Sequence, residues 1–318
     1  MKNSPVLVVS NLIKTFPSRS TPSGMINAVN NISFTIHEGE IVGLLGLNGA
    51  GKTTTIQMLL STLTVTSGDI TYFGKNFFLH RSRSLQHVGF ASSYVSMPPN
   101  FTVYHNLMLH GRLYGLYGAT LKKRVFEYLD IFDMAHVKDN DIRTLSSGQK
   151  TRVMLARAFM TRPKIVLLDE PTASLDPDIA QQVRQFIVKQ RRDYNVSVLI
   201  TSHNMDEMTE LCDRVLVMQK GVIIADNTPE ALAACVSMVR VKLMLGDGLK
   251  RTVAYVEHHK LVYVVEERWI YVQIDEHKIA QFLTDLAHQG VNYIQVAIEK
   301  PTLEDYFLTV ARGKNGVL

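Results

Sequence analysis

The sequence is poor in several features that would each define a class of protein. Among its 318 residues there are two cysteines, Cys212 and Cys235, and they do not form a CxxC spacing. A disulfide framework is therefore excluded, and a reducing compartment is the simpler interpretation. No segment approaches the roughly 18 consecutive apolar residues of a membrane span, and the start, MKNSPVLVVSNL, has too short an apolar run for a secretory signal. We therefore expect a chain that does not cross a bilayer by itself.

A strong excess of one charge is also absent. Lys and Arg total 34 against 29 Asp and Glu, which gives a net charge of +5. This excess suits an anionic ligand or a membrane surface, although most such charges are simply solvated. The basic runs at residues 122–124 and 191–192 lack interleaved aromatic side chains, so they indicate helix faces in water and not a nucleic-acid groove. His258 and His259 are adjacent, but no HExxH or Cys/His spacing supports a metal site.

What the sequence does contain is the pattern of a large α/β domain. Hydrophobic residues make up 46% and charged residues 20%, which is ordinary for a folded soluble protein. Alternating apolar and polar residues over 6–41 predict antiparallel strands with one face in solvent. Continuous apolar runs at 41–45, 165–168 and 196–200 predict strands buried on both faces of a parallel sheet. Helical periodicity over about 92–162 predicts a helical subdomain inserted into this core.

The pattern changes after about residue 235. We expect strands at SMVRVKLML, RTVAYVEH, KLVYVVEE and WIYVQID, then the helix EHKIAQFLTDLAHQG, the strand VNYIQVAIE and the helix PTLEDYFLTVAR. Thr302 and Asp305 are expected to form a capping pair at the last helix start. The sequence thus predicts two domains, 1–235 and 236–318, of which the second is a small α+β domain without a catalytic constellation.

The segment GLNGAGKT fits the phosphate-binding pattern G-x-x-x-x-G-K-[ST]. It follows the predicted strand IVGLL and precedes the predicted helix TTTIQMLLSTL, as this motif requires. Glycines let the backbone approach phosphates, Lys52 would reach the β- and γ-phosphates, and the Thr53 hydroxyl would ligate Mg²⁺. A plain glycine turn before a helix is the alternative, and the context favours nucleotide binding. The binding residues expected here are Asn48, Gly49, Ala50, Gly51, Lys52, Thr53 and Thr54.

Two further strand ends carry polar residues. IVLLDEP ends on Asp169 and Glu170, and VSVLITSH ends on Ser202 and His203. Ligands of open parallel sheets bind beyond the carboxyl ends of the strands, so these side chains should lie near Lys52. We expect Asp169 to hold Mg²⁺, Glu170 to orient and deprotonate the attacking water, and His203 to contact the γ-phosphate. A solvated turn and a packing histidine are the ordinary alternatives.

The segment LSSGQ lies where a helix begins, and free N–H groups at a helix start point toward anions. An ordinary capped helix is the usual interpretation of such a segment by itself. Here, however, GLNGAGKTT, LSSGQ, IVLLDE, ASLD and TSH follow one another along residues 6–235. This order resembles the ATPase cassette of ABC transporters, with its Walker A, signature, Walker B, D-loop and H-loop motifs. In the signature position are Ser146, Ser147, Gly148 and Gln149.

The resemblance implies an ABC-type α/β ATPase core with an antiparallel β subdomain, and a site shared between two chains. In this family two cassettes pair head to tail, so that ATP on one chain's Lys52 is capped by the other chain's signature helix. The D-loop position falls on Asp176. An aromatic residue that stacks on adenine would be Phe16, for which strand packing is nearly as good an interpretation.

The sequence departs from the family pattern at two positions. Where the family places a glutamine that touches Mg²⁺ and the water, this chain has Ser93, and Gln86 lies too early to replace it. A serine reaches the metal only through a water, so hydrolysis rate and coupling are the properties affected. Ser147 replaces the first glycine of the usual signature; its hydroxymethyl either crowds the backbone or adds a donor.

The function expected from this resemblance is that of the ATP-hydrolysing subunit of a membrane exporter, with ATP and Mg²⁺ as cofactors. Its partners would be a separately encoded permease and a second cassette, identical or not, and it would lie peripherally on the cytoplasmic face of the cell membrane. The ending KPTLEDYFLTVARG is similar to the tails of drug, polysaccharide or lipid export ATPases. A non-transport ABC ATPase acting on ribosomes or DNA is the alternative, although such proteins usually carry two cassettes or a long coiled coil. A small-molecule kinase would leave LSSGQ and TSH unexplained.

Overall fold

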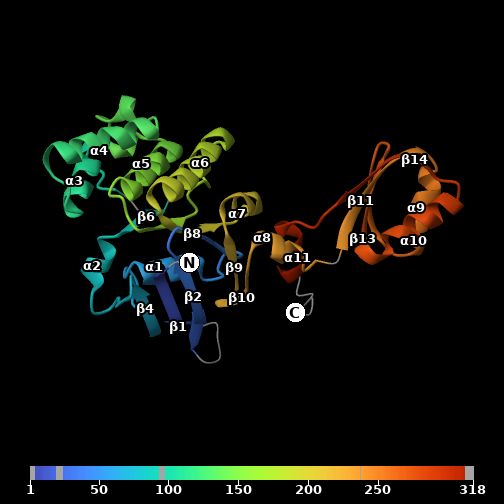
Figure 1. The fold of residues 1–318 in the computed structure, drawn as a ribbon, viewed down its shortest axis with the longest axis horizontal. Coiled ribbons are helices and arrows are strands. Elements are labelled where there is room, and N and C mark those ends of the chain that lie inside the picture. Colours follow the sequence, from blue (N-terminus) through green and yellow to red (C-terminus); the bar gives the residue numbers. More distant parts are fainter. Residues whose placement is uncertain (1–3, 19–23, 93–96, 237, 312–318) are drawn as a thin grey trace. The chain divides into compact units, whose positions relative to one another are not determined.

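The computed structural model describes residues 4–18, 24–92, 97–236 and 238–311 (Figure 1). The chain divides into two compact units, unit 1 (residues 1–228) and unit 2 (residues 229–318). This division falls a few residues before the expected boundary at 235, because helix α8 (Pro229–Ala233) packs against helix α11 (Leu303–Ala311) near the end of the chain.

A four-stranded antiparallel sheet opens unit 1, with the strand order β2-β1-β4-β5. Buried positions mostly alternate with half-buried ones along β1 from Leu7 to Lys14, as the alternating sequence over 6–41 predicts. The apolar faces of this sheet form one core with helix α1 and the parallel sheet. The strands are β1 (Pro5–Pro17), β2 (Met25–His37), β4 (Ser67–Tyr72) and β5 (Lys75–Asn76).

A six-stranded sheet forms the centre of unit 1, in the order β10-β9-β3-β8-β7-β6. Five of its strands are parallel, and β10 pairs antiparallel with β9 at one edge. Every residue of β3, β7 and β8 is buried, which confirms the strands predicted from continuous apolar runs. The strands are β3 (Ile41–Leu45), β6 (Val88–Ser92), β7 (Ile165–Asp169), β8 (Ser197–Ser202), β9 (Arg214–Gln219) and β10 (Val222–Asn227).

The register of the parallel strands aligns their carboxyl ends. Ser92 lies opposite Asp169, and Asp169 lies opposite Thr201. On the next strand pair, Leu45 lies opposite Ser202. The polar residues that end β6, β7 and β8 therefore share one edge of the sheet with the start of the phosphate loop.

The helices of unit 1 lie around this sheet. Helices α3, α4 and α5 contact one another and α5 contacts β6, so they form the predicted helical segment beyond the β6 edge (Figure 1). Leu121, Val125 and Leu129 are buried along α4, as their spacing predicts. The helical elements are α1 (Lys52–Leu59), α2 (Arg81–Leu85), α3 (Val103–Leu113), α4 (Gly118–Ile131), η1 (Ala135–Val137), η2 (Ile142–Thr144), α5 (Ser147–Phe159), α6 (Pro177–Tyr194) and α7 (Met205–Leu211).

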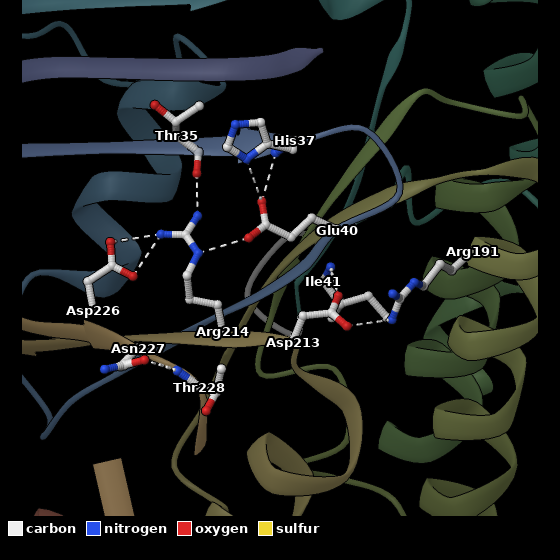
Figure 2. A network of polar contacts seen from close by, with 10 residues as sticks. All are labelled: Thr35, His37, Glu40, Ile41, Arg191, Asp213, Arg214, Asp226, Asn227 and Thr228. Atoms are coloured by element: carbon white, nitrogen blue, oxygen red, sulfur yellow. Dashed lines mark hydrogen bonds and ion pairs between the residues drawn. The ribbon is translucent and has the colours of Figure 1, made fainter. Parts of the chain in front are cut away.

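A polar network joins the two sheets of unit 1 at the amino ends of strands β3 and β9 (Figure 2). The phosphate loop follows the opposite, carboxyl end of β3. Arg214, the first residue of β9, donates to Glu40 Oε1 at 2.8 Å and to both carboxylate oxygens of Asp226 at 2.7 Å. It also donates to the carbonyl of Thr35 on β2. One guanidinium thus binds the antiparallel sheet, the turn before β3 and the edge strand β10.

The neighbouring Asp213 continues this network toward the helices (Figure 2). Its Oδ2 accepts from the backbone N–H of Ile41 at 2.9 Å, and its Oδ1 lies 2.9 Å from Nη1 of Arg191 on α6. The amino ends of β3 and β9 are therefore fixed to each other and to α6 by side chains.

Unit 2 is built on a four-stranded antiparallel sheet with the order β12-β13-β11-β14. Its chain order after α8 is strand, helix, strand, strand, helix, strand, which is the split βαβ arrangement. Helices α9 and α10 contribute to the apolar core on one face of the sheet. The elements are β11 (Met238–Asp247), α9 (Leu249–His258), β12 (Val262–Glu266), β13 (Trp269–Asp275), η3 (Glu276–Lys278), α10 (Ile279–His288) and β14 (Asn292–Glu299).

One element of unit 2 differs from the sequence-based expectation. The segment RTVAYVEH is part of helix α9 and not a strand. Gly248, at φ 93, turns the chain into the helix, and the buried residues Thr252, Tyr255 and Val256 recur at the three-to-four spacing of one helix face. The β-branched residues suggested a strand, but this spacing decided the structure because it covers the sheet core.

The expected cap of the last helix is confirmed. Thr302 Oγ1 accepts from the N–H of Asp305 at 3.3 Å, and Asp305 Oδ2 accepts from the N–H of Thr302 at 2.9 Å. Among the described residues, no helix combines the length and apolar character that a membrane span requires.

Candidate functional site

The phosphate loop between β3 and α1 is held in a backbone shape that its glycines make possible. Gly49 and Gly51 have φ values of 79° and 109°, in the left-handed region. A Cβ at Gly51 would lie 2.4 Å from the carbonyl oxygen of Ala28, and one at Gly46 would lie 2.4 Å from that of Met218. No real side chain tolerates such contacts, so the neighbouring strands fix the form of the loop.

Lys52 closes this loop from inside. Its Nζ donates to the carbonyl of Gly46 at 2.7 Å and to that of Leu47 at 3.2 Å, and the residue is only 6% exposed. Burial lowers the pKa of Lys52, while the carboxylates of Glu170 and Asp169 oppose this change. The ammonium group is therefore already placed beside the loop carbonyls, facing two negative charges.

Asp169 lies at the end of β7 and is 2% exposed. Its Oδ1 accepts from Thr201 Oγ1 on the adjacent strand at 2.7 Å. The same oxygen lies 3.5 Å from Thr53 Oγ1, the hydroxyl that follows the loop lysine. A carboxylate and a hydroxyl from two different elements thus converge, with the carboxylate held from behind by β8.

Glu170 turns the chain away from the sheet with a φ of 50°. A non-glycine residue rarely adopts this conformation, which costs about 1–3 kcal/mol. Its N–H donates to both the carbonyl and the hydroxyl of Thr201, each at 3.1 Å, and this stabilises the turn. The carboxylate Oε1 then lies 3.5 Å from Nδ1 of His203, whose side chain is 64% exposed. The two residues expected to act on water and phosphate therefore meet at the sheet edge.

The LSSGQ segment begins helix α5 with a complete capping box. Ser146 Oγ accepts from the N–H of Gln149 at 3.2 Å, and Gln149 Oε1 accepts from the N–H of Ser146 at 3.0 Å. Since Oγ accepts in this box, its own proton stays available for donation. In the described part of the chain, the box leaves the first-turn N–H groups of Ser147 and Gly148 for an anion.

The remaining expected residues lie in separate places. Asp176 precedes α6 as its N-cap residue, with Pro177 at the first helical position. Phe16 lies on β1, where Lys14 Nζ is 4.9 Å from its ring centroid. Ser93 lies outside the described residues.

Among the described residues, Thr53 contacts Asp169 and His203 contacts Glu170, which follows Asp169 in the chain. Lys52 bonds to the loop carbonyls and interacts electrostatically with both carboxylates. These five residues form one cluster. Within the same described ranges, no hydrogen bond or ion pair joins Phe16 or the start of α5 to this cluster.

Comparison with known proteins places this site in a family. The sequence model of the ABC transporter family matches residues 29–173. The linearmycin resistance ATP-binding protein LnrL of Bacillus subtilis (strain 168) is 30% identical over 297 residues, which cover 90% of this chain and 94% of the relative. The chain belongs to the ABC transporter family of ATP-binding proteins. Its cassette binds and hydrolyses ATP.

Other comparisons agree with the fold of this ABC ATPase. The bacitracin transport ATP-binding protein BcrA of Bacillus licheniformis is 29% identical over 308 residues, covering 96% of this chain and 99% of the relative. The solved structure of cbiO1 from Clostridium perfringens, part of the ABC transporter complex cbiONQ, has a TM-score of 0.62 at 26% identity and covers 80% of this chain and 96% of its own. A dimeric ATP-binding cassette bound to ADP and Pi, in a post-hydrolysis state, has a TM-score of 0.65 at 22% identity over 70% of this chain and 98% of its own. The α/β fold class predicted from the sequence is confirmed.

The sequence-based predictions missed two residues of this ABC ATPase, one that contacts the site and one that binds the segment following it. Thr201 binds both Asp169 and the backbone of Glu170. The signal for it was the parallel pairing of IVLLD with SVLITS, which places a hydroxyl beside the aspartate. Glu207, on α7, binds Thr172 two residues after Glu170. No pattern in the sequence marked it, because a glutamate in the first turn of a helix ordinarily indicates capping.

Proposed function

We propose that this ABC ATPase powers a membrane exporter through the ATP-driven pairing of two cassettes. One observation carries the proposal: Lys52, Asp169, Glu170 and His203 meet at one sheet edge, in a chain that also has a second phosphate-ready helix start at residues 146–149. The names of the two relatives, which concern linearmycin resistance and bacitracin transport, support export of a molecule across a membrane.

In this proposal the phosphate loop binds the nucleotide. Backbone N–H groups of the loop surround the phosphates, and the Lys52 ammonium moves from the loop carbonyls to the β- and γ-phosphate oxygens. Binding replaces neutral carbonyl acceptors with charged ones, which gives shorter and stronger hydrogen bonds. The nucleotide-contacting residues proposed are Asn48, Gly49, Ala50, Gly51, Lys52, Thr53 and Thr54.

The donor set beside the loop fits Mg²⁺. Thr53 Oγ1 and Asp169 Oδ1 approach each other at 3.5 Å, and both are oxygen ligands of the type that Mg²⁺ prefers. Thr201 keeps the carboxylate in place by its hydrogen bond at 2.7 Å. Bound Mg²⁺ would neutralise charge on the β- and γ-phosphate oxygens.

Hydrolysis requires a water aligned with the γ-phosphate and a group that accepts its proton. We assign the proton-accepting role to Glu170, whose carboxylate lies next to His203. His203 would donate to the γ-phosphate and keep the carboxylate oriented toward the water. The chemistry is therefore one of positioning and charge stabilisation, without a covalent intermediate on the protein.

The second phosphate-ready element acts in the paired state. The Ser146 proton and the N–H groups of Ser147 and Gly148 would bind the γ-phosphate held by the partner chain, at the positive end of α5. These contacts exist only while the γ-phosphate is present, so ATP favours the dimer and hydrolysis releases it. Asp176, the N-cap residue of α6, is the D-loop position, and Phe16 is the candidate for stacking on adenine.

The remaining assignments concern partners and place. We propose a separately encoded permease as the membrane-spanning partner and a peripheral position on the cytoplasmic face of the membrane. No nucleic acid is expected as a ligand. With Ser93 at the usual glutamine position, the side chain would reach the metal only through a water. Both a dimer of identical cassettes and a dimer with two unequal sites are compatible with this substitution.

A single substitution tests the proposal. Glu170→Gln keeps the shape of the side chain but removes its basicity, so the variant should bind ATP, hydrolyse it about 10²–10⁴-fold more slowly and accumulate as a dimer. Light scattering with size exclusion in ATP and in ADP measures the dimer, and phosphate release measures hydrolysis. Hydrolysis at the parental rate would remove Glu170 from this role. Co-sedimentation with ribosomes, without activity in vesicles that contain a permease, would favour the non-transport alternative.

A further inference from the structure

A third carboxylate, in addition to the two that follow strand β7, is buried close to the hydrolytic cluster. Glu207 on α7 is 2% exposed. Its Oε1 accepts a hydrogen bond from Thr172 Oγ1 at 2.9 Å. Its Oε2 is buried and has no hydrogen-bond partner among the described residues.

A buried carboxylate oxygen without a hydrogen-bond partner lowers the stability of the fold. We therefore ask what function this carboxylate serves. A glutamate at this place in a helix ordinarily bonds back to the N-cap backbone. Here the cap works in one direction only: Asn204 Oδ1 accepts from the N–H of Glu207 at 3.1 Å, and the carboxylate points to another segment. Burial raises the pKa of Glu207, and the hydroxyls of Ser202 and Thr172 together with nearby Arg184 oppose this rise.

The segment that Glu207 binds connects two parts of the nucleotide site. It begins at Glu170, the proposed proton acceptor, and leads to Asp176 at the start of α6. A Cβ built at Gly148 would lie 3.5 Å from the carbonyl oxygen of Ser174 and 3.6 Å from Leu175 Cδ2, so this segment passes close to the start of α5. Thr172 lies between these two ends.

The segment has few other anchors in the part of the chain that the structure describes. At its start, the N–H of Glu170 is bound to Thr201 on β8. Beyond that point, the backbone bonds Ala173 N–H to Glu170 O (3.4 Å) and Leu175 N–H to Thr172 O (3.0 Å) are internal to it. They shape the segment without attaching it to the sheet edge. The side chain of Glu207 supplies the attachment.

We propose that Glu207 is a positioning residue for ATP hydrolysis: through Thr172 it fixes segment 170–176 between Glu170 and the start of α5. The residue touches neither nucleotide nor water. It keeps a fixed distance between Glu170, the proton acceptor, and the start of α5, which would cap the phosphate. Both groups of one chain are then correctly placed when a second chain pairs with it. The inference rests on the function proposed above. It states that Glu207, which lies outside the hydrolytic site, holds the parts of that site at their distance from each other.

The test removes the hydrogen bond by a substitution at Thr172 and leaves the buried Glu207 in place. Thr172→Val has nearly the shape of threonine but no donor, so it should fold and bind ATP with an affinity within about twofold of the parent. Loss of a charge-assisted hydrogen bond that orients the site should lower kcat roughly tenfold. Thr172→Ser restores the donor and should restore kcat. Thr209→Val is the matched control, because the Thr209 hydroxyl donates to Met205 O within the same helix α7 at 2.9 Å.

A double substitution separates positioning from stability. Glu207→Met removes the carboxylate and keeps the buried volume, and combined with Thr172→Val it replaces both partners by apolar groups. The double variant should lose no more kcat than Thr172→Val alone, and its thermal midpoint should lie at or above that of the single Glu207→Met variant.

The outcomes distinguish this inference from the proposed function. If the parental protein hydrolyses ATP and Glu170→Gln does not, while Thr172→Val keeps the parental kcat, the positioning role is refuted. A loss in Thr172→Ser or Thr209→Val equal to that in Thr172→Val would refute it as well. If Glu170→Gln hydrolyses ATP at the parental rate, the proposed function itself fails.

Discussion

Replacing Arg214 with methionine removes the positive charge that joins the two sheets of unit 1 and keeps most of the side-chain volume. In the parental protein this guanidinium bonds to Glu40, to Asp226 and to the carbonyl of Thr35 (Figure 2). The Arg214 side chain is 23% exposed, that of Glu40 is 16% exposed and that of Asp226 is 40% exposed. Most of the effect should therefore come from Glu40, which is left without its cation in a half-buried site.

The size of the effect follows from these exposures. A hydrogen bond to a charged group contributes about 1.5–3 kcal/mol, and removal of one partner also costs the desolvation of the other. The exposed bond to Asp226 adds little because solvent screens it. We expect a loss of about 2–3 kcal/mol in the free energy of unfolding, which for a unit of this size lowers the thermal midpoint by about 4–12 °C.

The effect should also depend on pH in a defined direction. Burial by itself raises the pKa of Glu40, but the hydrogen bonds and charge of Arg214, with the N–H of His37, outweigh this and hold the pKa below its ordinary value of 4.5. A lowered folded-state pKa contributes stability above that value, which is lost as the pH falls through the folded-state pKa. The difference between parent and variant should therefore be greatest near neutral pH and shrink below pH 4.5.

Calorimetry of the full chain from pH 7 downward measures both quantities. Arg143→Ala is the control, because Arg143 bonds to Asp141 on the surface with its side chain 65% exposed. We expect no measurable change in midpoint for this control. A variant at Arg214 that unfolds at the same temperature as the control, or whose deficit grows on acidification, would refute the assignment of this network as a clamp between the sheets.

Three further substitutions test the nucleotide site. Lys52→Ala should abolish ATP binding, measured by calorimetric titration, and an unchanged affinity would contradict the whole assignment of the phosphate loop. Gly51→Ala should abolish ATP binding and destabilise unit 1 by about 2 kcal/mol or more, because its Cβ would lie 2.4 Å from the carbonyl oxygen of Ala28 at a φ of 109°. Ser146→Ala should cost about 1 kcal/mol, since the cap accepting from Gln149 is lost, and should weaken the ATP-dependent dimer seen by light scattering; an undiminished dimer would exclude the cap from the partner's site.

The parallel core and its nucleotide cluster were predictable because their signals are local. A buried strand followed by Asp169 and Glu170, and a glycine loop followed by Lys52, carry their chemistry in consecutive residues. Their convergence followed from the rule that parallel strands end at one edge. The ATPase activity and the family could therefore be predicted from short motifs and their order along the chain.

What the sequence left hidden depends on contacts between distant segments. Thr201 is important because register places it opposite Asp169, and register is a property of pairing and not of either strand alone. Glu207 accepts its hydrogen bond from Thr172 only when α7 lies against the segment that follows β7. The strand expected at RTVAYVEH became α9 because the sheet of unit 2 needs a helix over its core, and Tyr255 and Val256 supply that face.

Ser92, Asp169 and Thr201 lie opposite one another on adjacent strands. The geometry of the site therefore depends on the length of these strands. Deletion of one residue within β7 would turn Asp169 toward the opposite face of the sheet, since successive side chains alternate. Substitutions along these buried strands therefore preserve the site when they stay apolar and close to the original volume, while insertions and deletions are barred. The count of residues between the start of a strand and its polar end sets the proposed metal site as firmly as the identity of the carboxylate.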